Sequence, residues 1–274
     1  MLNLAKIAYE LRRDALRTIQ AAGSGHIGGS FSMAEIMSVL YFDRMNVRPE
    51  EPAWPDRDRL VVSKGHCSAI TYAALARRGF FSEAEMMTFR KIDSRFSGHV
   101  TKEVPGVDAS TGSLGQGLSI AAGMALSAKM FDKRYRTYVV TGDGEMQEGQ
   151  IWEAAMAAGS AKLDNLVWFV DNNDLQLDGC IRDVMDIYPI DEKLRAFHWN
   201  TVTIDGHDVN QVKAALEIAE GCKGKPTAIV AKTVKAKGVS FMEGVVKWHG
   251  GHPSADEFVR AYAELDQRIT ELEE

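Results

Sequence analysis

The chain has 274 residues, of which 45% are hydrophobic and 26% are charged, and its formal net charge is −6. This composition is too apolar for a disordered protein, and the length is sufficient for a globular, soluble domain with a buried core. The acidic balance argues against nucleic acid as the main partner, because binding to a phosphate backbone requires a basic surface.

The three cysteines, Cys67, Cys180 and Cys222, are widely spaced. They match neither a disulfide framework nor a zinc-finger pattern, which favours a reducing, cytoplasmic location. The N-terminal segment carries charges among its apolar residues and lacks the apolar core of a signal peptide. No apolar run approaches the length of a membrane span, so we expect no membrane association.

Helical periodicity dominates the first part of the chain. Apolar residues at helical spacing predict a helix over residues 3–22, which ends at a Gly-Ser-Gly turn. Ser32 is expected to be an N-cap, with Glu35 three residues later, for a helix through Tyr41. Two further helices are expected, over residues 66–78 and 82–91.

The rest of the chain alternates strand and helix patterns. A Gly- and Ala-rich segment, 115–130, is predicted to be a helix. Because strands and helices alternate after it, we expect an α/β fold with a central, mostly parallel sheet flanked by helices. No linker or repeat divides residues 1–274, which favours a single domain. The expected strands are 137–141, 165–171, 201–204 and 227–231, with helices over 150–162 and 209–219.

Two of these strands are followed directly by polar residues. Gly142-Asp143-Gly144 follows the first, and Asn172-Asn173 follows the second. Since ligands in open α/β sheets bind at the carboxyl ends of the strands, both turns should lie at one ligand-binding edge. Glycines allow a close approach to phosphates, but a carboxylate would repel a bare diphosphate. A hard dication such as Mg²⁺ or Ca²⁺ would bridge the two, with the Asn173 amide and the Leu175 carbonyl as further oxygen ligands.

Other readings of these turns remain open. Each motif alone is more often a plain turn than a ligand site. The strand-loop-helix unit also resembles a dinucleotide-binding fingerprint, with Asp164 about twenty residues after the loop as the acidic residue. Against that reading, Gln147 stands where the third glycine would be, and Asp143 carries the wrong charge.

Several of the seven histidines lie beside glycine, which can present an imidazole ring to a cleft. A lone Gly-His pair is weak evidence, so several such segments must converge before catalysis is the better interpretation. His207 is expected to be structural, because Asp205 and Asp208 can fix its loop. His249 and His252 are not expected to bind zinc, since no carboxylate or thiol accompanies them.

The segments around these residues resemble those of the transketolases, in the family's order, from about His26 to His249. They are SGHIGGSFSMAEIMSVLY, LVVSKGHCSA, FSGHV, TGSLGQG, GDGEMQEG, VDNNDLQLDG and WHGGHPS. The resemblance implies the thiamine diphosphate-binding fold, with thiamine diphosphate held through Mg²⁺ or Ca²⁺. It implies Asp143, Asn173 and the Leu175 carbonyl as metal ligands. The implied cofactor contacts are His66, Gly112, Leu114, Gly142, Asp143, Gly144 and Asn173.

The resemblance also implies catalytic roles. His26, His99 and His249 would bind sugar hydroxyls and move protons near the thiazolium, and histidine suits this because it titrates near neutral pH. Glu148 would lie at a dimer interface and join a proton network between cofactor sites. The chain departs from the family pattern at three positions, none of which is an implied ligand: Ile27, Ser113 and Glu145.

In this family a second domain encloses the aminopyrimidine, and nothing resembling that domain occurs in this sequence. We therefore expect the N-terminal subunit of a split transketolase, a transferase of two-carbon ketol units between sugar phosphates. Its expected partners are a separate pyrimidine-domain chain and a second copy of itself, in a dimer or an α2β2 heterotetramer. The acidic tail from Ala255 is expected to be a solvated helix.

Three alternatives compete with this hypothesis. The nearest is another thiamine diphosphate enzyme, such as a deoxyxylulose-phosphate synthase or an E1 dehydrogenase subunit. A NAD-binding oxidoreductase would use the dinucleotide-like loop, and a non-enzymatic regulatory subunit would bind the cofactor without turnover.

Overall fold

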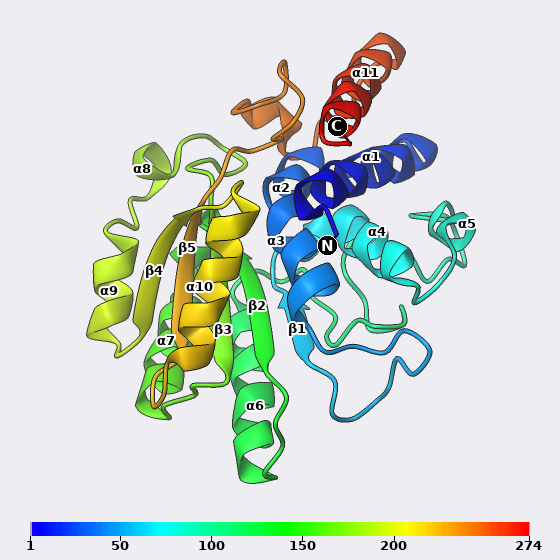
Figure 1. The fold of residues 1–274 in the computed structure, drawn as a ribbon. Coiled ribbons are helices and arrows are strands. Elements are labelled where there is room, and N and C mark those ends of the chain that lie inside the picture. Colours follow the sequence, from blue (N-terminus) through cyan, green and yellow to red (C-terminus); the bar gives the residue numbers. More distant parts are fainter. Residues whose placement is uncertain (1, 274) are drawn as a thin grey trace.

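A computed structural model describes residues 2–273 and contains one five-stranded sheet (Figure 1). The strand order is β1-β2-β3-β5-β4, and every neighbouring pair is parallel. The predicted α/β class is therefore confirmed. The strands are β1 (Arg59–Val62), β2 (Thr137–Gly142), β3 (Leu166–Asn172), β4 (Asn200–Asp205) and β5 (Thr227–Lys232).

Eleven α-helices surround the sheet in the part of the chain described. Short turns of other helix types occur at Leu40–Arg44, Gly65–Cys67, Gly144–Gln147 and Val246–His249. The α-helices are α1 (Leu4–Ala22), α2 (Ile27–Ser32), α3 (Ala34–Val39), α4 (Ser68–Arg78), α5 (Glu83–Met86), α6 (Gln116–Met130), α7 (Gly149–Ser160), α8 (Ile181–Val184), α9 (Ile190–Ala196), α10 (Val209–Gly221) and α11 (Ala255–Glu271).

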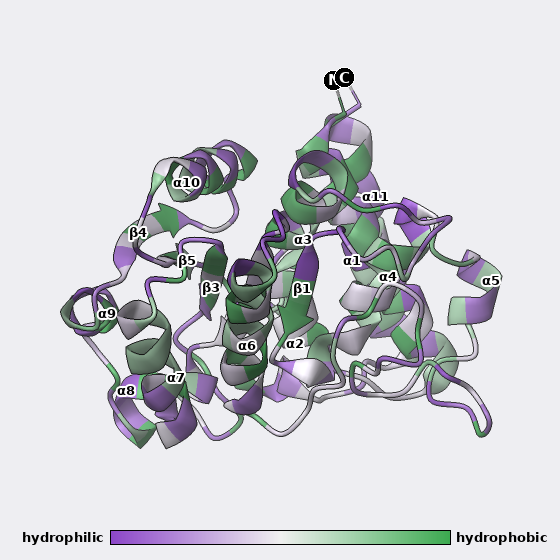
Figure 2. Ribbon diagram, turned by 90° about the horizontal axis from the view of Figure 1, so that it is seen from below, coloured by the Kyte–Doolittle hydropathy of each residue, from purple (hydrophilic) through white to green (hydrophobic). Residues whose placement is uncertain are grey.

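Both faces of the sheet are buried, and alternate strand residues belong to two separate cores. Tyr138 and Phe169 pack into the core built with α1, α3, α4 and α10. Val139 and Trp168 point to the opposite face and pack with α6, α7 and α9. Figure 2 shows α10 and α7 on opposite sides of the sheet. This two-sided burial explains why the middle residues of β2 and β3 are apolar on both faces.

The helix positions follow from the direction in which the chain moves across the sheet. From β1 to β3 it moves one way, and α6 and α7 cover one face. After β4 it steps back to β5, and because parallel crossovers are right-handed, α10 covers the other face. The carboxyl ends of all five strands nevertheless lie at one edge, where the candidate site is found.

The expected cap at Ser32 is wrong. Ser32 is the last residue of α2, and its hydroxyl donates to the Asp171 carboxylate at 2.5 Å, with the Gly29 carbonyl as a second acceptor at 3.0 Å. Glu35 accepts two hydrogen bonds from Arg12 and does not complete a capping box. A carboxylate from the distant strand β3 thus competes successfully for the Ser32 hydroxyl, a partner that local sequence cannot reveal.

Two other expected helices also differ from the structure. Residues 82–91 contain only the short α5, which begins with a capping box at Ser82 and is followed by turns. The tail beginning at Ala255 is helical, but it is not fully solvated. Its apolar stripe is buried against α1, through Phe258, Ala261, Leu265 and Ile269. Within residues 2–273, no helix combines the length and apolarity needed to cross a membrane.

Candidate active site

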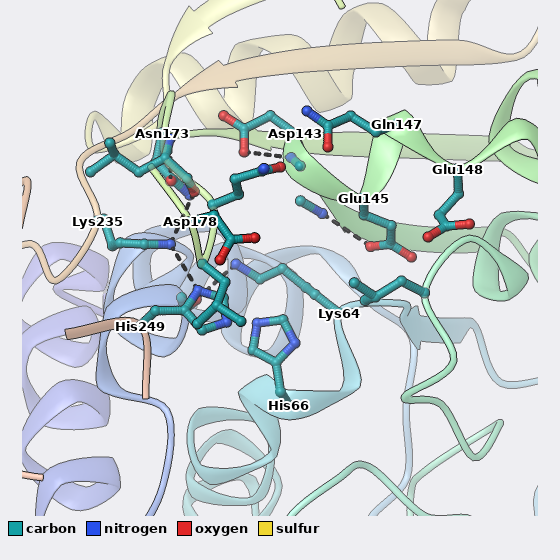
Figure 3. A pocket seen from close by; sticks show the side chains of 17 residues that line it. Lys64, His66, Asp143, Glu145, Gln147, Glu148, Asn173, Asp178, Lys235 and His249 are labelled. Carbon is teal, nitrogen blue, oxygen red and sulfur yellow. Dashed lines mark hydrogen bonds between the residues drawn. The ribbon is translucent and has the colours of Figure 1, made fainter. Parts of the chain in front are cut away.

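A cavity of about 330 Å³ opens at the carboxyl edge of the sheet (Figure 3). Four strands contribute to it through the residues that follow them: Lys64 and His66 after β1, the glycine turn after β2, Asn173 after β3 and Lys235 after β5. Figure 3 shows Asp143 and Asn173 on one side of the pocket and His66 and His249 on the other. The two turns expected to share an edge therefore line one cavity.

Asp143 is buried, with 1% of its surface exposed. Its carboxylate accepts hydrogen bonds from the backbone N–H groups of Gly144 and Asp174, at 2.8 and 2.6 Å, and from the Asn172 amide at 3.0 Å. Burial raises the pKa of Asp143 to about 6, and the charge of the neighbouring Asp171 acts in the same direction. No lysine or arginine among the described residues forms an ion pair with Asp143 that would compensate its charge. A bound dication would supply that compensation.

The two neighbouring asparagines have different surroundings. Asn172 is buried; its amide nitrogen donates to Asp143 and to the Tyr188 hydroxyl, and its amide oxygen accepts from Lys232. Asn173 lines the cavity and its side-chain oxygen accepts only a local bond, at 3.2 Å, from the N–H of Leu175. The geometry therefore makes Asn173 available to a ligand and Asn172 a support for the carboxylate.

The donor set fits a hard cation. A carboxylate, an amide oxygen and a backbone carbonyl are the oxygen ligands that Mg²⁺ and Ca²⁺ prefer. One of these oxygens already binds a positive group, since the Lys235 ammonium donates to the Leu175 carbonyl at 3.1 Å. Residues 2–273 contain no group of three or more His, Cys, Asp or Glu side chains able to hold a metal. A cation here would need the oxygens of a bound anion to complete its shell.

Four histidines from distant segments converge beside the cavity. The ring centre of His26 lies 5.0 Å from that of His66, 5.7 Å from that of His249 and 6.2 Å from that of His99. Burial lowers the pKa of His26 and of His249 to about 4, helped by the charge of Lys235. These rings are neutral at pH 7 and can accept protons. The Nδ1 atom of His26 is buried without a hydrogen-bond partner, as expected of a ligand-binding group.

The other expected residues lie around the mouth of this site. Leu114 and the exposed Glu148 line the cavity itself. Gly112 lies outside it, with φ of +146°, and a Cβ there would come 3.0 Å from the ring of His99. Glu145 is buried and binds the Ser63 hydroxyl and the N–H groups of Gly115 and Gly142, so this departure from the family pattern serves to join three loops.

Sequence reasoning missed the two lysines of the cavity. Lys64 is buried in an ion pair with Asp171 and donates to the Gly29 carbonyl at 2.8 Å. Lys235 lies between Leu175 and His249, whose Nδ1 is 3.3 Å from its ammonium. Lys64 follows β1, a strand too short to show a sequence period, and Lys235 lies three residues after β5. A lysine at such a position is usually a surface residue.

The dinucleotide interpretation is wrong, because Asp164 precedes β3. It lies at the opposite edge of the sheet, where it accepts from the Gly224 N–H and pairs with Lys129. His207 does not line the cavity; its ring contacts Glu35, and its backbone N–H donates to Asp205. The ring of His252 packs against Phe258 at 5.2 Å, away from the cluster.

Comparison with known proteins identifies the family. Residues 4–267 match the family described as "Transketolase, thiamine diphosphate binding domain". The chain belongs to the transketolase family. Within it the chain corresponds to the thiamine diphosphate-binding domain, which accounts for the glycine turn and the histidine cluster at one sheet edge.

Two transketolase relatives match along nearly their whole length. The chain is 42% identical over 262 residues to one of the subunits of apulose-4-phosphate transketolase from Phocaeicola vulgatus, covering 96% of this chain and 93% of that protein. It is 41% identical over 267 residues to the 6-deoxy-6-sulfo-D-fructose transketolase subunit SqwG of a Clostridium species, covering 97% of both.

Single-chain transketolases match over less than half their length. The chain is 44% identical over 250 residues to the human enzyme, covering 90% of this chain but 39% of that one. Among solved structures, transketolase from Leishmania mexicana superposes with a TM-score of 0.87 at 29% identity, over 100% of this chain and 46% of that one. The fold of the transketolase cofactor domain is therefore shown, and the comparisons do not favour the other thiamine diphosphate enzymes.

Proposed function

We propose that this chain is the N-terminal, diphosphate-binding subunit of a two-chain transketolase. The complex transfers a two-carbon ketol unit from a ketose phosphate to an aldose phosphate. The observation that carries the proposal is the near full-length match to two proteins named as transketolase subunits. We treat residues 1–274 as one cofactor-binding domain, whose pyrimidine-binding counterpart is a separate polypeptide.

The metal and the diphosphate are assigned to one wall of the cavity. Asp143, Asn173 and the Leu175 carbonyl would hold Mg²⁺ or Ca²⁺, which would neutralise the charge between the carboxylate and the diphosphate. Bound thiamine diphosphate supplies the carbanion and the electron sink for C–C bond cleavage. This assignment is supported by the uncompensated burial of Asp143 and by the ammonium already at Leu175. The remaining cofactor contacts are assigned to His66, Gly112, Leu114, Gly142 and Gly144.

The histidine cluster is assigned to the sugar. His26, His99 and His249 bind substrate hydroxyls, accept the proton from the donor hydroxyl and return one to the acceptor. The neutral rings of His26 and His249 at pH 7 suit the first of these steps, and the unpartnered Nδ1 of His26 offers a free binding atom. A cluster of four rings provides more than one route for the proton.

Association of two copies of this chain requires an interface, and we place part of that interface at the mouth of the cavity. Glu148 is exposed there, and we assign it to an interface between two copies within a dimer or an α2β2 heterotetramer. Cys67, Cys180 and Cys222 are free thiols, which supports a reducing cytoplasmic location.

The test is reconstitution of ketol transfer from purified chains. The chain is mixed with a candidate pyrimidine-domain chain, thiamine diphosphate, Mg²⁺, and a panel of ketose phosphate donors and aldose phosphate acceptors. Transfer is expected only when both chains are present and is abolished by Asp143→Asn. Full transfer by this chain alone would disprove the two-chain proposal, and decarboxylation of pyruvate without ketol transfer would assign it to another thiamine diphosphate reaction.

A further inference from the structure

His207 joins two parts of the molecule that meet behind the cavity. It lies in the turn after β4, where its Nε2 accepts the backbone N–H of Val234 at 2.8 Å. Its Nδ1 lies 3.0 Å from the Glu35 carboxylate. Since Nε2 accepts, the hydrogen of a neutral imidazole must be on Nδ1, which donates to Glu35. One ring thus bridges α3 and the segment after β5.

The Glu35 end of this bridge is rigid. Its carboxylate accepts two hydrogen bonds from Arg12, both of 2.7 Å, and Arg12 also donates to the Phe31 carbonyl. The two side chains have 0% and 4% of their surface exposed. A buried, bidentate pair of this kind has little freedom to move, so it is a fixed anchor for the imidazole.

The other end is the 233–236 segment, which carries Lys235 into the cavity. Its neighbouring backbone groups are bound to backbone: the Thr233 N–H to the Asn172 carbonyl at 3.1 Å, and the Ala236 N–H to the Gly28 carbonyl at 2.9 Å. Between them, the Val234 N–H is bound by the His207 ring. The hydrogen bond from His207 therefore fixes the backbone one residue before Lys235.

The Gly-His sequence is required for this approach. A Cβ at Gly206 would lie 2.5 Å from the side chain of Thr233, so only glycine lets the turn reach the 233–236 segment. This close approach gives a structural reason for the Gly206-His207 pair, which has no role in the proposed catalytic chemistry.

We infer that His207 is a positioning residue for the cation and diphosphate site. Its neutral imidazole fixes the 233–236 segment to the Arg12–Glu35 pair and thereby sets the Lys235 ammonium between Leu175 and His249. The inference rests on the proposed function, because it assigns His207 to the loading of that same cofactor site. His207 touches neither substrate nor cofactor and acts only through Lys235.

Two substitutions separate the two ends of the bridge. In His207→Asn the amide nitrogen takes the place of Nδ1, which keeps the bond to Glu35 and loses the bond to Val234. In His207→Gln the amide oxygen takes the place of Nε2, which keeps the bond to Val234. We expect His207→Asn to weaken binding of thiamine diphosphate with Mg²⁺ about tenfold by calorimetry, the effect of about one hydrogen bond. His207→Gln, which keeps the bond to Val234 but loses the bond to Glu35, is expected to weaken binding less than His207→Asn does.

A double substitution and a cofactor-free measurement complete the test. If His207 acts through Lys235, adding His207→Asn to Lys235→Met should weaken binding no further. Amide exchange at Val234, measured by NMR without cofactor, should be fast in His207→Asn and slow in His207→Gln. Wild-type affinity in His207→Asn, or additive effects in the double variant, would overturn the inference. Failure of the wild-type chain to bind the cofactor with Mg²⁺, with the pyrimidine-domain chain present, would instead refute the proposed function.

Discussion

The Lys235 ammonium lies 3.1 Å from the carbonyl oxygen of Leu175, so a cationic side chain contacts an oxygen that we assign to the metal. Burial, together with the charge of Lys64, lowers the pKa of Lys235. Two positive groups cannot share one carbonyl favourably. Metal and ammonium therefore compete for Leu175 until an anionic diphosphate gives the ammonium another partner.

Removing this charge should affect metal and diphosphate in opposite directions. In Lys235→Met we expect tighter binding of Mn²⁺ alone, measured by electron paramagnetic resonance, because the Leu175 carbonyl is freed. Binding of inorganic pyrophosphate with Mg²⁺ should weaken about 10- to 100-fold, the usual effect of a lost charge-assisted hydrogen bond. Lys235→Arg is the matched control. Weaker binding of both ligands would show that Lys235 supports the site only structurally.

The adjacent asparagines should separate stability from metal binding. Asn172→Ala removes one of the three hydrogen bonds that the buried Asp143 carboxylate accepts, together with the Asn172 bonds to Tyr188 and Lys232, and should lower the free energy of unfolding by about 1–3 kcal/mol. Asn173→Ala should leave the unfolding midpoint in urea nearly unchanged and weaken Mg²⁺-dependent binding of thiamine diphosphate. If Asn173→Ala bound the cofactor and metal normally, Asn173 would not be a ligand.

The buried pair between Arg12 and Glu35 should dominate the stability of the N-terminal half. Arg12→Met leaves Glu35 buried and unpaired, and we expect a loss of about 3–5 kcal/mol in chemical unfolding. Arg13 is the matched control, because its pair with Asp266 is exposed and should contribute less than about 1 kcal/mol. Similar losses in Arg12→Met and Arg13→Met would contradict this view of the core.

The ion pair between Arg12 and Glu35 should stabilise the fold at neutral pH and lose this effect in acid. Burial alone would raise the pKa of Glu35, but Arg12 and the bond from His207 hold it at about 2, below the ordinary 4.5. Because the folded-state pKa is depressed, this stabilisation is complete above about pH 4.5 and is lost as pH falls towards 2. The difference in the free energy of unfolding between wild type and Glu35→Gln should decrease as the pH is lowered from about 4.5 towards 2. A constant difference would argue against a charged Glu35.

The partly buried histidines of the cluster, His26 and His249, should resist protonation. Burial lowers the pKa of His26 and His249 from 6.5 to about 4, so between these values the unfolded chain binds protons that the folded chain does not. The free energy of unfolding therefore decreases as the pH drops from 6.5 to 4. In His249→Gln, which lacks one of these rings, this decrease should be smaller than in the wild type. Ring signals in NMR titrations should remain those of neutral imidazole at about pH 5.5, and Lys235→Met should raise both pKa values. Titration near the ordinary value in the intact chain would contradict the burial of these rings.

The sequence was sufficient to predict the parallel sheet and the two polar turns at its edge. Asp143 and Asn173 were recognisable because each follows an apolar strand, and chain direction alone places such turns together. Strand β1 was missed because its four residues are too few to show a period. The buried face of α11 had a visible signal, since Phe258, Ala261 and Leu265 recur at helical spacing, but its acidic surface favoured a solvated helix.

Other features depended on tertiary pairing. Lys64 is buried because the Asp171 carboxylate, on strand β3, neutralises its charge. The same carboxylate accepts a hydrogen bond from the Ser32 hydroxyl, which therefore does not cap the expected helix. His207 was expected to be structural, with its loop fixed by Asp205 and Asp208, yet its ring binds Glu35 and the Val234 backbone, partners distant in sequence. Such pairs cannot be derived from local spacing, because they exist only once the strands are assembled.

The most direct test of the central claim is a calorimetric titration of the chain with thiamine diphosphate, in Mg²⁺ and then in excess chelator. Because a buried carboxylate can face a diphosphate only across a dication, we predict binding in Mg²⁺, little binding in chelator, and little binding by Asp143→Asn in either buffer. Asp178→Asn, which neutralises an exposed acid lining the same cavity, is the charge-matched control. Equal affinity with and without Mg²⁺, unchanged by Asp143→Asn, would contradict the metal bridge.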